Sequence, residues 1–299
     1  MSANLVAGHL PPGLWFFFFW LSTLLALIYV GVPVLAVGVS VWWATFRARR
    51  DAPRWLVRRA RLGRLTGIGV GALAGIVLTW FGRAMVAPAA VGVGYLSGVL
   101  VAELLAVQQP TGPLRVASLQ PRNARRYLPR WAVPVAVAVG VPVMAGPVAV
   151  IAAEHFGWTQ EVTPALFLPL AVVAALALGL GAIALRRVEL VPLAAEGGPE
   201  VDEGVRRNTA RAVAGAVVGI ELLLLAALAL VLSDELTRSV DDYRASSILL
   251  SCAAGLAVAA VLVWCVLGWW KRVPPPQSAL VPAGPKPPEP PSFQASKIA

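Results

Sequence analysis

The chain has 299 residues, of which 58% are hydrophobic and only 13% are charged. An ordinary soluble domain is about one quarter charged, so a soluble fold of this length would lack the charged residues that cover an exterior. The composition excludes ordinary soluble classes and indicates a protein whose solvent is lipid. The net charge is +10, but the basic residues flank apolar stretches. We therefore expect them to bind anionic lipid headgroups and not nucleic acid.

The first apolar stretch, residues 14–46, is unusually long. Trp15 and Trp43 lie near its two ends and are separated by about 42 Å if the stretch is one helix. That length matches a bilayer with its headgroup zones, where tryptophan is enriched. The stretch is too short for two spans and a turn. It predicts one tilted transmembrane helix, with a kink at Pro33.

Six further apolar stretches have the length of about 20 residues that a transmembrane helix needs. They cover 65–81, 89–107, 132–153, 165–185, 212–232 and 247–270. The sequence therefore predicts an all-α integral membrane protein, with a bundle of seven transmembrane helices in residues 1–272. The segment 273–299 is rich in proline and has no apolar periodicity, so we expect a disordered tail.

Basic residues, lysine and arginine together, are concentrated in every second connection between the apolar stretches. Of the 25 basic residues, 22 lie in 47–64, 108–131, 186–211 and 271–299, and only Arg83, Arg238 and Arg244 lie in the other connections. Basic loops stay in the cytoplasm. This pattern predicts an N-terminus outside and a C-terminus in the cytoplasm. Arginine outnumbers lysine by 22 to 3, and alanine, glycine, valine and proline are abundant, which is typical of a G+C-rich bacterial genome. We therefore expect a multi-pass protein of the bacterial plasma membrane, whose first span stays as an anchor because no cleavable leader pattern precedes it.

The second half of the basic connection before the sixth expected span, Glu200 to Arg211, has a helical pattern. Glu203 stands three and four residues before Arg206 and Arg207, the spacing at which side chains meet on a helix. We expect this second half to form a cytoplasmic extension of the sixth helix. The loops and the tail are also candidate contacts for a cytoplasmic protein partner.

Only two acidic residues lie inside expected spans, and both are candidate polar sites. Glu103 stands near the cytoplasmic end of the third span, from where it could extend toward the interface. Glu221 lies about ten residues inside the sixth span. A carboxyl group at that depth must face the bundle or water, pair with a base, or be protonated. Structural pairing and proton or cation handling are both open for Glu221.

Small residues recur every four positions in three of the expected spans, which allows helix backbones to approach closely. The second span has Gly67, Gly71 and Gly75, the third has Gly94 and Gly98, and the sixth has Gly215 and Gly219. We interpret these as helix-packing stripes. Because Gly215 and Gly219 precede Glu221, we also expect Glu221 to face other helices.

The fourth expected span contains Pro134, Pro142 and Pro147. Proline removes a backbone donor and clashes with the preceding turn. Transporters place such broken helices at substrate sites, although kinked helices also occur in membrane proteins that transport nothing. The three prolines are therefore a candidate broken helix.

The sequence contains no nucleotide-binding loop, zinc-protease motif, serine-hydrolase motif or Cys-x-x-Cys pair. We assign no catalytic residue, metal ligand or cofactor. Three classes of function remain: a transport-related protein, either a small permease or the membrane subunit of a larger transporter; a scaffold, interaction or sensor protein without turnover; and an enzyme acting on lipid-linked substrates. The transport-related class is the leading hypothesis and the scaffold is its alternative.

Overall fold

The computed structural model describes six long helices and part of the segment before them. The described residues are 31, 34–35, 37–39, 41–43, 46, 54–80, 84–107, 126–155, 167–190, 198–239 and 243–268. The expected first span therefore lies mostly outside the described residues, and the proline-rich tail lies wholly outside them.

The described part of the chain is helical and contains no β-strand. Its elements are α3 (Arg54–Trp80), the 3-10 turn η2 (Ala84–Val86), α4 (Ala87–Val107), α5 (Ala132–His155), α6 (Leu168–Leu190), α7 (Gly198–Ser239) and α8 (Tyr243–Gly268). Five of them, α3 and α5 to α8, are long and apolar enough to cross a membrane, whereas the apolar part of α4 is shorter. The protein is thus an all-α membrane protein.

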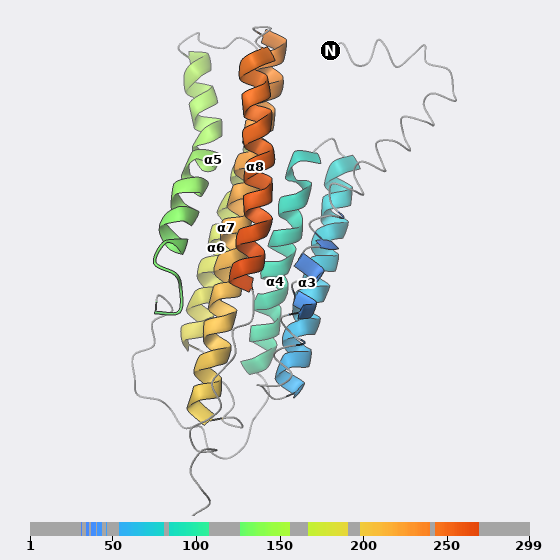
Figure 1. Ribbon diagram of the computed structural model, residues 1–299, viewed down its shortest axis with the longest axis vertical. Helices are drawn as coiled ribbons and strands as arrows, with labels where there is room; N and C mark the ends of the chain where they lie inside the picture. Colours follow the sequence, from blue (N-terminus) through green and yellow to red (C-terminus); the bar gives the residue numbers. More distant parts are fainter. Residues whose placement is uncertain are drawn as a thin grey trace, which may run out of the picture.

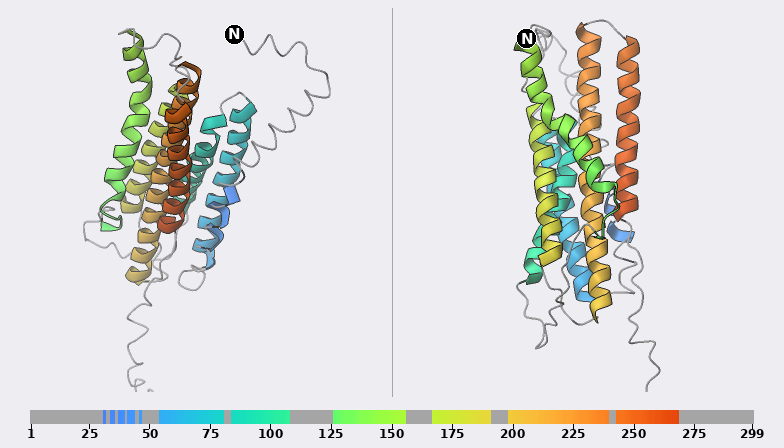
Figure 2. Two further views of the ribbon diagram at one scale, coloured as in Figure 1. Left: turned by 45° about the horizontal axis from the view of Figure 1, so that its top comes forward. Right: turned by 90° about the vertical axis from the view of Figure 1, so that its left-hand side faces the viewer.

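The six helices alternate in direction, so that successive helices are antiparallel (Figure 1). Helix α7 is the centre of the bundle and contacts α4, α5, α6 and α8. It is more enclosed than the other four candidate spans: 61% of its most apolar stretch is buried, compared with 17–28% for theirs. Helix α3 packs on the outside of α4 (Figure 2).

The outward faces of the bundle are apolar, as lipid requires. On α5, for example, Val133, Val137 and Val141 are exposed, whereas Ala136 and Gly140 on the opposite face are buried. Comparable exposed side chains stand on α3, α6 and α8, among them Val70, Leu73, Leu176, Ile183, Val258 and Leu262. Water would penalise so many exposed aliphatic groups, and the hydrocarbon core of a bilayer does not.

Helix α7 has 42 residues, a length of about 63 Å at 1.5 Å per residue. It therefore extends well beyond a hydrocarbon core of about 30 Å. The helix begins at Gly198, so residues 198–211 of the connection before the sixth expected span are helical. Glu203 pairs with Arg207 one turn later, with 3.5 Å between Oε1 and an Nη atom.

Arg206, the neighbour of Arg207, turns inward and is buried. Its guanidinium donates a hydrogen bond to the backbone carbonyl of Val188 in α6. Val188 belongs to the last four residues of α6, whose carbonyls have no partner within their own helix. A cation is also favourable at this negative end of the helix. Arg206 thus joins the start of α7 to the end of α6.

The close packing of α3 on α4 depends on two facing rows of small residues. A Cβ placed on Gly67 would lie 2.9 Å from Cα of Gly98, and one on Gly94 would lie 2.6 Å from Cα of Gly71. A Cβ on Gly75 would lie 2.8 Å from the carbonyl oxygen of Ala87. No side chain fits at these distances, so the stripes read from the sequence lie against each other, in antiparallel order.

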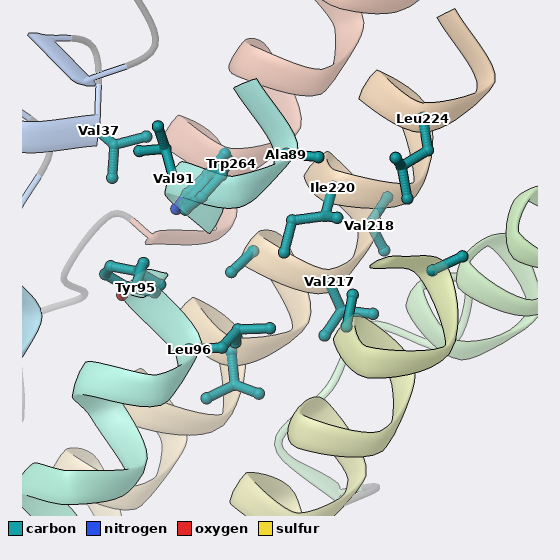
Figure 3. Close-up of a cluster of buried hydrophobic side chains, with 14 of the residues drawn as sticks. Val37, Ala89, Val91, Tyr95, Leu96, Val217, Val218, Ile220, Leu224 and Trp264 are labelled. Carbon is teal, nitrogen blue, oxygen red and sulfur yellow. The ribbon is translucent and has the colours of Figure 1, made fainter. Parts of the chain in front are cut away.

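The interior around α7 is aromatic and aliphatic. Val91, Tyr95 and Leu96 of α4 lie opposite Ile220 of α7, and Trp264 of α8 lies beside them (Figure 3). The rings of Tyr95 and Trp264 meet edge to face, with centroids 5.4 Å apart. This arrangement is favourable for two aromatic quadrupoles and connects α4 to α8 across α7.

The structure differs from the expectation of a broken helix at the three prolines. Helix α5 is continuous from Ala132 to His155 and contains Pro142 and Pro147 inside it. Pro134 is its third residue, where a backbone N–H would have no partner in the helix and proline is tolerated. Pro142 lies on the exposed side. The prolines therefore bend α5, as Figure 2 shows, without opening it into two half-helices.

Candidate functional site

Glu221 is completely buried in the middle of the central helix α7, with a relative exposure of 0%. Neither carboxyl oxygen has a hydrogen-bond partner among the described residues. Acidic residues are almost never fully buried unless they are paired. Among the described residues, Glu221 is the only acidic side chain with buried oxygens that lack a partner, and it is therefore the starting point for the function.

The carboxyl group lies in the region where three helices meet. Gly140 of α5 lies next to it: a Cβ placed on Gly140 would lie 3.0 Å from Oε2 and 3.2 Å from Cδ of Glu221. The same position lies 3.3 Å from Cδ1 of Leu178 in α6. One turn before Glu221, Val217 packs against Gly181 of α6, and Ile220 points toward α4 (Figure 3). The immediate surroundings are thus apolar.

An ionised carboxylate in these surroundings is costly. Even lenient insertion scales give about 3 kcal/mol for a charged acidic side chain at the centre of a membrane helix, and the cost rises when no hydrogen bond compensates for lost water. A carboxyl group without a basic partner avoids this cost by binding a proton or a cation. The arrangement can therefore take up and release a positive charge inside the bundle.

The structure corrects the reason for which we expected Glu221 to face other helices. Gly215 and Gly219 lie against α8: a Cβ on Gly215 would lie 2.7 Å from Cβ of Leu267, and one on Gly219 would lie 3.1 Å from the Trp264 ring. Glu221 follows Gly219 by two residues, about 200° around a helix, and faces α5 instead. It is buried because α7 is enclosed on several sides and not because it shares the glycine face.

The other candidate sites are not brought to Glu221 by the described contacts. Glu103 belongs to α4, but its side chain lies outside the described residues. Gly67, Gly71, Gly75, Gly94 and Gly98 form the α3–α4 contact, away from α7. Gly140 stands between the prolines of the fourth expected span, but the sequence does not indicate that Gly140 or Leu178 lies beside Glu221, because this depends on how α5 and α6 pack on α7.

The part of the chain that the structure describes holds no group of three or more histidine, cysteine or acidic side chains that could bind a metal ion. We compared the chain with known proteins. No family model, curated protein or solved structure matches it.

Proposed function

We propose that this chain is a transport-related protein of the bacterial plasma membrane, either a small permease or the membrane subunit of a larger transporter. In this proposal Glu221 is its ion-binding group, which takes up and releases a proton or a cation as the helices around α7 move. The observation that carries the proposal is the complete burial of an unpartnered carboxyl group in the central helix. Ionisable groups inside membrane spans are typical of ion pathways and proton relays.

The proposal includes seven spans, with the N-terminus outside and the C-terminus in the cytoplasm. The distribution of basic residues between connections supports it. Two features of the fold agree with it: the described helices alternate in direction, and the arginine-rich start of α3, end of α6 and start of α7 lie at one end of the bundle (Figure 1).

We further propose that this arginine-rich end binds anionic lipid headgroups. The guanidinium of Arg61 lies over the ring of Trp42, with Cζ 3.9 Å from the ring centroid. A stacked arginine–tryptophan pair suits the headgroup zone, where the ring lies near the acyl chains and the charge meets phosphate. A cytoplasmic protein partner would meet the same end of the bundle.

The alternative function is a scaffold, interaction or sensor protein that moves no substrate. The tight contact between α3 and α4 favours it, because two helices whose glycines touch form a stiff unit. In that case Glu221 would be a packing residue, and its replacement by glutamine would be nearly silent, since the shape is preserved and the amide can still form hydrogen bonds.

Charge displacement after a rapid ion jump separates the two functions without knowledge of the substrate. Purified protein is reconstituted in liposomes on a solid support, and the bath is switched to a higher concentration of protons, Na⁺, K⁺ or Mg²⁺ in turn. Under the proposed function, at least one jump produces a transient current in the wild type, because a charge enters the low-dielectric interior. Glu221→Gln should lose this current, because the amide cannot ionise.

The control is the amount and the melting temperature of each reconstituted protein, which should agree between wild type and Glu221→Gln. If both proteins give the same transient current for every jump, or if neither gives one, the transport proposal is wrong and the scaffold function is favoured.

A further inference from the structure

We infer that the Glu221 site takes a proton and not a metal cation, and that Gly140 is the positioning residue that makes room for the carboxyl group. This inference rests on the proposed function and narrows it, since the proposed function allows either kind of ion. It is carried by the surroundings of the carboxyl group and by its contact with α5.

Among the described residues, the lack of a cluster of metal-binding side chains favours the proton. A hard cation such as Mg²⁺ or Ca²⁺ needs about six oxygen ligands, and a single carboxylate supplies two. Both Glu221 oxygens lack a hydrogen-bond partner among the described residues, and the described residues hold no group of three or more histidine, cysteine or acidic side chains that could supply the remaining ligands. A proton needs a single oxygen. It converts the carboxylate into a neutral acid, which tolerates apolar surroundings far better.

The titratable groups on the elements that pack against α7 leave this conclusion unchanged. Those with described side chains are Tyr95 on α4, His155 on α5, Arg186, Arg187 and Glu189 on α6, and Cys252 and Cys265 on α8. None of them hydrogen-bonds to Glu221. Tyr95 is instead in contact with Trp264. His155 is fifteen residues from Gly140 along α5, about 22 Å, and Arg186 is eight residues from Leu178 along α6, about 12 Å.

Gly140 sets where the carboxyl group can lie. A methyl group at this position would lie 3.0 Å from Oε2 and 3.2 Å from Cδ of Glu221, closer than ordinary van der Waals contact. Cδ1 of Leu178 would lie 3.3 Å from the same methyl group, whose position is fixed by the backbone of α5. Alanine at position 140 would therefore displace the carboxyl group. Gly146, on the same helix, is a matched control. A methyl group at this position would have its nearest neighbour, Cδ1 of Phe167, at 3.6 Å, which is ordinary van der Waals contact.

Infrared spectroscopy of the protein in lipid nanodiscs tests both parts. A protonated carboxyl group has a C=O stretching band that a carboxylate lacks, and the difference between wild type and Glu221→Gln isolates the band of Glu221. At neutral pH we expect this band in buffer whose only added salt is choline chloride. It should stay unchanged when Na⁺, K⁺ or Mg²⁺ replaces choline at constant pH and ionic strength.

A band that is absent in all buffers, or that disappears when one of these cations is added, would overturn the proton assignment. The proposed function would survive this result, because a cation-binding carboxylate still gives a transient current after an ion jump. Conversely, a proton band without any transient current would leave the proton assignment intact and refute transport.

The glycine variants test the positioning role in the same spectra. Gly140→Ala should shift the Glu221 band, because the acid moves to a different environment, whereas Gly146→Ala should leave the band in place. An unshifted band in Gly140→Ala would refute the role of Gly140. If Gly140→Ala does not fold, the double variant Gly140→Ala/Glu221→Asp should fold, because the acidic side chain is shorter by one methylene. Failure of the double variant to fold would equally refute the role.

Discussion

Arg206 and Arg207 show how two adjacent residues of one type perform different tasks. Arg207 is on the outside of α7 and pairs with Glu203, with side chains that are 50% and 57% exposed. Arg206 is buried and donates to a carbonyl at the end of α6. Exposed pairs contribute little because water and salt screen them. A buried charged donor matters more, because its removal leaves a backbone acceptor without a partner.

We therefore predict different stabilities for two variants. Arg206→Gln should lower the free energy of unfolding by about 2 kcal/mol, the usual effect of losing a hydrogen bond to a charged group. Arg207→Gln should change it by less than about 0.5 kcal/mol. Melting temperatures of both variants in the same nanodiscs provide the comparison. Equal losses would show that the contact with Val188 does not hold α6 and α7 together.

At the scale of an element, the glycines of α3 also differ by position: some lie in the interface with α4 and others face outward. Gly67 touches the backbone of α4, whereas a Cβ on Gly69, two residues later, would meet nothing within 4 Å. Helical residues two apart lie on nearly opposite faces. One substitution therefore acts in the helix interface and the other toward the outside.

Gly67→Ala should force α3 and α4 apart and cost about 1–3 kcal/mol, as overpacking does. Gly69→Ala should leave stability unchanged or raise it by about 0.5–1 kcal/mol, because alanine favours a helix more than glycine does. Unfolding of each variant in detergent, followed by circular dichroism, gives the two values. If Gly67→Ala were as stable as Gly69→Ala, Gly67 would not lie against the backbone of α4.

The packing surface between α3 and α4 could be predicted from the sequence because a repeat of four residues maps onto one helix face. The site could be predicted only in part. Glu221 stands out as an acid in an apolar span, but Gly140 becomes meaningful only when α5 is placed on α7. The effect of the prolines could not be predicted for a related reason. The sequence shows that Pro142 lacks a backbone donor, but only the structure shows that α5 stays continuous and that this residue faces outward.

At the scale of the whole molecule, the proposed topology places the arginine-rich end of the bundle and the opposite end on different sides of a membrane. Helix α7 connects the two ends without interruption. Position 207 near its start and position 237 near its end are about 45 Å apart, the thickness of a bilayer with its headgroups. The depth of Glu221, and every role proposed for it, depends on this placement.

Cysteine labelling in intact cells tests this central claim most directly. In a variant whose two native cysteines are replaced by alanine, Thr237→Cys should react with a membrane-impermeant maleimide, and Arg207→Cys should react only after the cells are opened. Single cysteines in 1–13 and 154–164 should behave like Thr237→Cys, and those in 47–64 and 108–131 like Arg207→Cys. Labelling of Arg207→Cys in intact cells, with Thr237→Cys protected, would invert the orientation, and equal labelling of both would contradict a membrane-spanning α7.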